Sequence, residues 1–230
     1  VKPSSPNHLR AFVDELEKLR QELRAQAGEE DLRHLRKMER WGRISTAIGF
    51  LTAWMAPNPL SAALLSLGTF ARWTMMGHHI RHRGYDKVPG VPARYRSTVF
   101  ARGARRFIDW FDWLLPEAWE YEHNQLHHYH LGENADPDLV EHNLAWLRKS
   151  NAPRFAKRLL SYFMACIWKW IYYAPNTLAE LRRAAARRNG STEKTIPSGL
   201  FAYATWSPFS PFGRQLWRIC LLPYPLWNFV

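Results

Sequence analysis

The chain has 230 residues and carries 32 Lys and Arg against 20 Asp and Glu, a formal net charge of +12. This balance indicates an anionic partner and leaves nucleic acid, a lipid headgroup surface and an acidic protein open. Twelve tryptophans favour a membrane surface, because Trp is enriched at membrane–water interfaces. The two cysteines, Cys166 and Cys220, form no CxxC motif and argue against a disulfide framework, so we expect a reducing compartment.

Residues 1–43 read as a polar helical leader. Leu16, Leu19 and Leu23 recur at helical spacing among charged residues, which is typical of a helix that is largely exposed to solvent.

The composition turns apolar from Ile44, and residues 44–76 predict a helical hairpin. Two apolar runs flank Pro57-Asn58-Pro59, where proline can end one helix and begin the next. Each run is shorter than the roughly 20 residues that cross a bilayer core, unless flanking residues are included. Because both ends carry basic residues, we expect the hairpin to enter a membrane from the cytoplasmic side and return there. The alternative is a hairpin buried in a soluble protein.

Three later segments also suggest contact with a membrane. An apolar stripe beside arginines, formed by Phe107, Trp110, Phe111 and Leu114, fits a helix that lies in the interface and equally a core helix of a soluble protein. Residues 158–175 are apolar and aromatic but include a lysine, so we expect a second interfacial helix there. Residues 214–230 read as the start of another membrane helix.

Histidine is concentrated in two short runs, GHHIRH at residues 77–82 and EHNQLHHYH at residues 122–130. His78 and His82 are four residues apart, as are His123 and His127, so each pair shares one face of a helix. His128 is expected to point about 100° away from its pair. Imidazole is the commonest metal ligand. The histidines of the two runs together outnumber the four ligands that one zinc ion needs, which favours a dinuclear site.

Metal-bound histidines usually donate their second ring N–H to a carboxylate or a carbonyl. Nearby carboxylates can support the ligands in this way or can simply be solvated or cap helices. The candidates are Glu122, Asp136, Asp138, Asp109 and Asp112. No HExxH motif is present, which argues against a zincin-type protease.

The two runs resemble the histidine boxes of the membrane fatty acid desaturase superfamily. His78 to His82 matches the HxxxH form of the first box, and His123 to His128 matches the HxxxHH form of the second. The likeness covers residues 44–141 and then extends only to topology, so we treat 44–230 as one incomplete desaturase-like domain. Two such boxes behind a hairpin are a specific signal, whereas either alone would be weak.

This resemblance implies an all-α integral membrane protein whose cytoplasmic helical cap carries the boxes. It implies two iron ions, O2 as co-substrate, and electrons from cytochrome b5 or a ferredoxin with its reductase. The reaction would remove two hydrogens from a lipid or acyl-CoA chain and leave a C=C bond. The resemblance places the protein in the endoplasmic reticulum or a bacterial inner membrane, and it implies no nucleic-acid partner. The implied ligands are His78, His79, His82, His123, His127 and His128, with His130 a weaker candidate.

The chain departs from the family pattern because no histidine follows His142, so the third box is missing. We expect that box to lie beyond Val230 in a longer protein and this chain to be inactive alone. Three alternative functions remain. The chain could belong to a related lipid, sterol or carotenoid hydroxylase, to a non-catalytic basic protein that binds membrane surfaces or nucleic acid, or to a soluble zinc hydrolase.

Overall fold

The computed structural model describes residues 6–54, 58–110, 112–139, 144–190, 196–197 and 202–223. Every regular element within these ranges is helical, which confirms the all-α prediction. The chain divides into two compact units, residues 1–102 and 103–230. None of the helices in the described ranges has both the length and the apolar character needed to cross a membrane.

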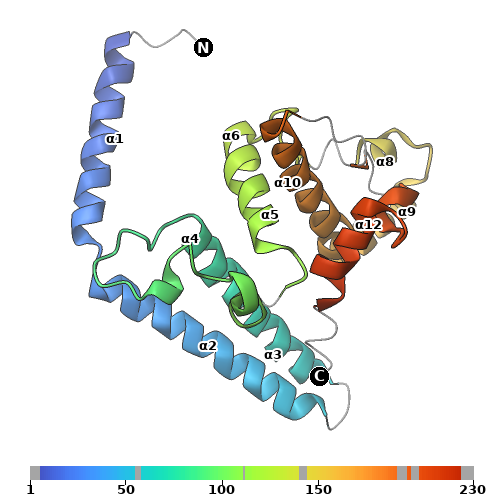
Figure 1. Ribbon diagram of the computed structural model, residues 1–230, viewed down its shortest axis with the longest axis horizontal. Helices are drawn as coiled ribbons and strands as arrows, with labels where there is room; N and C mark the ends of the chain where they lie inside the picture. The colour runs from blue at the N-terminus through green and yellow to red at the C-terminus, as the bar shows by residue number, and fades with distance from the viewer. Residues whose placement is uncertain are drawn as a thin grey trace. The chain divides into compact units, whose positions relative to one another are not determined.

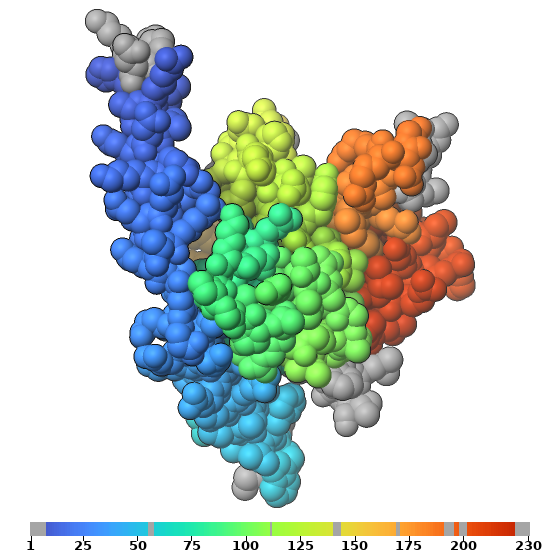
Figure 2. Space-filling view, turned by 60° about the vertical axis from the view of Figure 1, so that its left-hand side comes forward, coloured from blue at the N-terminus to red at the C-terminus, as the bar shows by residue number. Residues whose placement is uncertain are grey.

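The first unit begins with two long helices. α1 (Pro6–Gln26) is joined by a short turn to α2 (Glu29–Ala53) (Figure 1), and Figure 2 shows this N-terminal part of the chain as a dark blue column. Its apolar side chains are largely exposed, including Leu16, Leu19 and Leu23, as the leader interpretation expects. The boundary that we expected between residues 43 and 44 falls inside α2, which runs without interruption from the charged leader into the apolar segment.

α2 and α3 (Pro59–Phe70) form the expected helical hairpin and lie side by side (Figure 1). α3 begins with Pro59 in its first turn, and the Asn58 side chain caps it by accepting a hydrogen bond from Ser61 N–H at 2.8 Å. Two polar contacts add to the packing of the hairpin. The hydroxyl groups of Thr52 and Ser61 lie 2.7 Å apart, and Arg72, which follows α3, donates from Nη2 to Thr46 Oγ1 at 2.8 Å.

The two helices approach closely because the residues between them are small. A Cβ atom at Gly68 would lie 2.0 Å from Thr46 Oγ1 and 2.9 Å from the carbonyl oxygen of Gly42, and one at Gly49 would lie 2.8 Å from Leu65 Cγ. Glycine at these positions therefore sets the distance between the helices.

Gly68→Val should push α2 and α3 apart and lower the free energy of unfolding by about 1–3 kcal/mol or more. The new side chain would collide with backbone atoms of Gly42 and Thr46, which cannot move aside as a flexible side chain can. Ser66→Val is the matched control, because Ser66 is exposed on the same helix. Thermal unfolding followed by circular dichroism compares the two, and equal midpoints would contradict this view of the hairpin.

The rest of the first unit carries the first histidine run and a loop. A π-helical segment, η1 (Ala71–Gly77), leads into the short α4 (His78–Arg81), and η2 (Ala93–Tyr95) lies in the loop that follows. Tyr95 donates a hydrogen bond to Glu39 of α2, and burial followed by this bond raises the pKa of Tyr95 to about 12. The Asp86 carboxylate accepts bonds from the N–H and the hydroxyl of Ser97 at 2.7 and 2.6 Å. These contacts tie the loop to α2 and to itself.

The second unit is built from shorter elements. They are η3 (Gly103–Arg105), η4 (Arg106–Trp110), α5 (Pro116–Tyr121), η5 (Glu122–His127), α6 (His128–His130), α8 (Ala145–Lys149), α9 (Arg154–Trp168), η6 (Lys169–Tyr173), α10 (Ala174–Arg188), α11 (Tyr203–Trp206), α12 (Pro211–Leu216) and η7 (Trp217–Leu221). α5 packs on α10, and α12 packs on α11.

Of the two interpretations of the apolar stripe that begins at Phe107, the structure supports the protein core for Trp110 and Leu114 and contradicts the membrane interface. Trp110 and Leu114 have no exposed surface and belong to the core of the second unit, where Trp110 lies 5.5 Å from Trp119 between ring centroids. Arg106 is also buried, and Phe111 lies outside the described residues. Trp110 and Leu114 are apolar because they pack inside protein, and spacing alone could not distinguish the two environments.

Of the expected membrane segment at 214–230, the structure describes residues 214–223. Leu216 and Cys220 have no exposed surface and pack within the second unit. Burial raises the pKa of the Cys220 thiol to about 12, whereas Cys166 is exposed.

Thiol labelling should therefore distinguish the two cysteines. With iodoacetamide at mildly alkaline pH we expect Cys166 alone to react in the folded chain, because a thiol reacts as its thiolate and must be accessible. Both should react after unfolding. Mass spectrometry reports the sites, Cys166→Ser should remove all native-state labelling, and rapid labelling of Cys220 in the folded chain would contradict the packing described here.

Candidate metal centre

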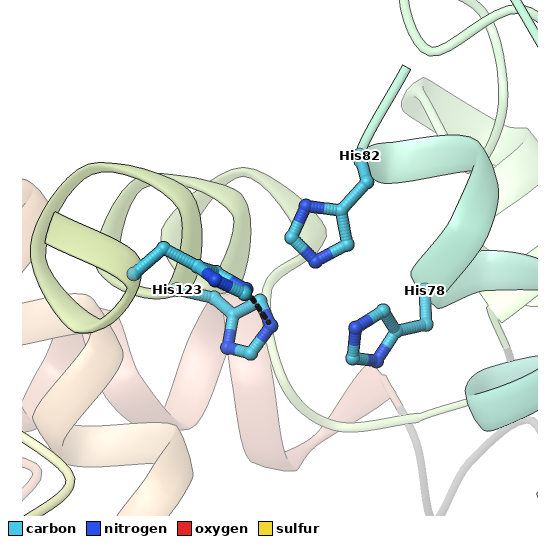
Figure 3. A group of neighbouring side chains, drawn as sticks. His78, His82 and His123 are labelled. Carbon is cyan, nitrogen blue, oxygen red and sulfur yellow. Dashed lines mark hydrogen bonds between the residues drawn. The ribbon is translucent and has the colours of Figure 1, made fainter. Parts of the chain in front are cut away.

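The first histidine run presents one pair of rings on a common face. α4 places His78 and His82 four residues apart, with the N–H of His82 donating to the carbonyl of His78 at 3.0 Å. Their ring centroids are 4.7 Å apart, and Figure 3 shows both rings on the same side of their helix. The sequence spacing predicted this pair.

His79 points elsewhere. It lines a cavity of about 750 Å³ in the first unit, together with His34, Asp31 and Tyr85. Its ring centroid is 5.9 Å from that of His78, but His79 is in neither group of close ligand atoms found among the described residues. The structure thus separates His79 from the pair that the sequence grouped it with.

The second histidine run begins in a π-helical turn, η5, and ends in α6, and this changes which side chains meet. In η5 the N–H of His128 donates to the carbonyl of His123, five residues earlier. A hydrogen bond that spans five residues brings residue i+5 back over residue i. His128 therefore lies over His123, with their Nε2 atoms 3.1 Å apart, and not on a separate face as an α-helix would place it.

This separation suits two ligands of one ion. Imidazole nitrogens bind zinc at about 2.0–2.1 Å, which places two of them roughly 3 Å apart. His127 joins the same cluster, with its ring centroid 5.2 Å from that of His123. All three imidazoles of the second run that match the HxxxHH pattern therefore come together.

Asp136 orients His127 from a turn that follows α6. Its Oδ1 lies 2.9 Å from His127 Nδ1, and the carboxylate also accepts backbone N–H groups of Asp138 and Gly132 at 2.9 and 3.1 Å. These contacts with His127 and the backbone amides lower the pKa of Asp136 against the opposing effect of burial, which is the largest single influence. With Nδ1 engaged, Nε2 is the nitrogen through which His127 can bind a metal.

Asp138 and Glu122 bring two more carboxyl groups to this turn. One carboxylate oxygen of Asp138 and one ring nitrogen each of His123 and His127 all lie within 4.8 Å of one another. Glu122 has no exposed surface. Burial, followed by the charge of Asp138, raises the pKa of Glu122 to about 9, and burial raises that of Asp138 to about 6.

The other two candidate carboxylates have structural roles. Asp109 forms an ion pair with Arg105 one turn away, at 2.8 Å, and Asp112 accepts a hydrogen bond from the N–H of Leu114 at 2.9 Å. Neither is in a group of close ligand atoms within the part of the chain that the structure describes. His130 likewise lies apart from these groups and has its Nδ1 3.0 Å from Glu133 Oε2.

Three aromatic residues of the site were not predicted. Trp119 stacks on His123 with ring centroids 4.4 Å apart, and its position four residues before His123 was the available signal. Tyr172 and Tyr173 of η6 reach the turn from 35 residues away: Tyr172 donates to the carbonyl of Pro137, and Tyr173 O–H lies 3.5 Å from Asp138 Oδ2. No local pattern in the sequence links this pair to the turn.

The second unit can therefore hold a metal ion with imidazole and carboxylate ligands, while the first unit offers a two-imidazole pair. Comparisons with protein-family models, with curated proteins and with solved structures found no match to this chain. The family resemblance is thus a hypothesis that rests on the residues themselves.

Proposed function

We propose that this protein is a membrane-bound desaturase of fatty acyl chains that uses two iron ions, O2 and electrons from cytochrome b5 or a ferredoxin. The observation that carries the proposal is the cluster of His123, His127 and His128, in which the Asp136 carboxylate fixes the orientation of one ring. A purely structural role makes no demand for such a set of convergent imidazoles.

The donor set fits iron. Imidazole suits iron as a ligand, and the cluster supplies three such rings. In the proposed enzyme His78 and His82 of the first unit and His123, His127 and His128 of the second would hold the two ions, and ligands from a third histidine box would complete the set. When bound, iron would supply the activation of O2 that removal of hydrogen from an unactivated CH2 group requires.

The residues around the ligands would keep the site ordered and dry. Asp136 holds the His127 ring through Nδ1, Trp119 stacks on His123, and Glu122 fills the buried side of η5. Such partners usually affect metal affinity 10–100-fold, since they fix the orientation and basicity of the ligands.

The side chains of the α2–α3 hairpin support insertion into a membrane. Its contact face is small and polar, with Gly42, Thr46, Gly49 and Gly68 between the helices. Large apolar side chains point outward and are 43–78% exposed, namely Ile44, Ile48, Leu51, Trp54 and Leu60. A hairpin in water buries its large apolar side chains, whereas helix pairs in lipid are joined by small residues.

The length of the apolar part suggests how far it enters. α3 and the apolar end of α2 from Ile44 to Ala53 are each about 15–18 Å long at 1.5 Å per residue, about half of the 30 Å hydrocarbon core. We propose that the hairpin enters one leaflet and returns, with its basic ends at the cytoplasmic face.

α9 would provide a second contact with the same kind of surface. Phe155, Leu159, Tyr162 and Phe163 form one helical face and are 57–73% exposed, beside Arg154, Lys157 and Arg158. Exposed rings beside basic residues are typical of a helix lying in the interface among anionic headgroups. The basic surface would also suit an acidic electron donor.

The test begins with the coding sequence beyond Val230, where the proposal requires two further apolar segments and an HxxHH or QxxHH box. The protein from the complete coding sequence is then expressed in a host membrane, and its iron content and lipid products are measured. Iron together with a new C=C bond supports a desaturase, and a hydroxylated product would replace it with the related hydroxylase. Membrane binding without iron or product would leave the non-catalytic surface protein as the better explanation.

A further inference from the structure

The second unit brings together three possible metal ligands without any residue of the first. His123 and His127 come from η5, and Asp138 comes from the turn after α6. One donor atom of each lies within 4.8 Å of the others, and all three side chains are partly buried. All three residues belong to residues 103–230.

Two imidazoles and one carboxylate form a recognised donor set. Bound on one face of a metal, they leave other positions open, and non-haem Fe(II) is the ion that takes this arrangement. The carboxylate also brings a negative charge, which an imidazole pair alone does not supply.

One carboxylate oxygen among these ligands is open to a cation. Asp138 Oδ1 is buried and has no hydrogen-bond partner among the described residues. Buried carboxylate oxygens without partners are costly, and a divalent cation between Asp138 and the two imidazoles would provide the missing interaction.

The two aspartates of the turn differ in what they can do. Asp136 is engaged with His127 Nδ1 and with two backbone N–H groups, so it is placed to position a ligand. The Asp138 carboxylate is approached by Tyr173 O–H at 3.5 Å and by the carboxyl group of Glu122, and it is the carboxylate that lies with His123 and His127 in a group of close ligand atoms.

We propose that His123, His127 and Asp138 bind one divalent metal ion within the second unit alone, with Asp138 as a direct ligand and Asp136 as a positioning residue. The site shares His123 and His127 with the proposed function but requires neither the first histidine run nor lipid chemistry. It also changes the role of Asp138, which the sequence suggested only as a supporting carboxylate.

The test uses Co(II) as the probe, with the 230-residue chain carrying Cys166→Ser to remove the exposed thiol. A second variant adds His78→Ala and His82→Ala, and should still bind about one equivalent of Co(II), because the three ligands lie elsewhere. Loss of all Co(II) from this variant, with binding retained by its parent, would overturn the independent site while leaving the proposed function intact.

Asp138→Cys tests direct ligation, with Asp136→Cys as its control two residues away. A thiolate bound to Co(II) gives a charge-transfer band in the near ultraviolet, which we expect for Asp138→Cys and not for Asp136→Cys. Bound Co(II) without the band in Asp138→Cys would overturn the assignment. The near-isosteric Asp138→Asn, with its fold checked by circular dichroism, should weaken Co(II) binding by more than 100-fold, and unchanged affinity would also overturn it. Failure of the parent chain to bind any Co(II) would count against this site.

Discussion

Replacing His127 with alanine should remove iron from the second unit and abolish lipid oxidation by the complete protein. Residues that only orient a ligand affect metal affinity 10–100-fold, so losing a ligand should lower product formation by more than about 100-fold. Its side chain is 22% exposed, and we therefore expect the helical fold to survive the substitution. Iron per chain and the lipid product are the measurements.

A graded series makes this prediction sharper. Asp136→Asn keeps the shape of the side chain that contacts His127 Nδ1 but removes its charge, so metal affinity should fall by about 10–100-fold and not vanish. His8→Ala on exposed α1 should change neither quantity. If His127→Ala retained both iron and product, the ligand assignment would be wrong; if it removed iron but left product formation intact, the metal would have no part in the chemistry.

Much of the local structure could be predicted because its causes are local. The spacing of His78 and His82 places them on one helical face whatever surrounds them. Asn58 and Pro59 form the start of α3 through their own side chains, as the PNP sequence indicated. The all-α fold likewise follows from helical spacing of apolar residues along most of the chain.

The missed features depend on contacts between distant segments or on a change in helix type. The π-helical turn η5 moved His128 over His123, and nothing in EHNQLHHYH distinguishes that turn from an α-helix. Trp110 is buried against Trp119 and not in a membrane interface. Tyr173 reaches Asp138 from a helix far along the chain. Periodicity predicts which residues share a face, but it does not predict what that face contacts.

Arg106→Met should cause the largest loss of stability in the second unit. The guanidinium is buried and donates to the carbonyls of Asp112, Trp113 and Leu114 at 3.3, 2.9 and 3.3 Å and to that of Ile219. It thereby joins the loop before α5 to η7. Methionine has a similar length but no donor, so these buried carbonyls would lose a charged partner, at about 3–5 kcal/mol in the free energy of unfolding.

Arg218→Met provides the matched control, because Arg218 is exposed on η7 next to Ile219. It makes the same change in charge and length one residue from the acceptor, and should alter the free energy of unfolding by less than about 0.5 kcal/mol. Chemical unfolding followed by circular dichroism and tryptophan fluorescence gives both values. Equal effects of the two substitutions would mean that net charge, and not the buried contacts of Arg106, stabilises this unit. A selective loss in Arg106→Met would instead show that one buried cation joins segments more than a hundred residues apart and so holds together the unit that carries the second histidine run.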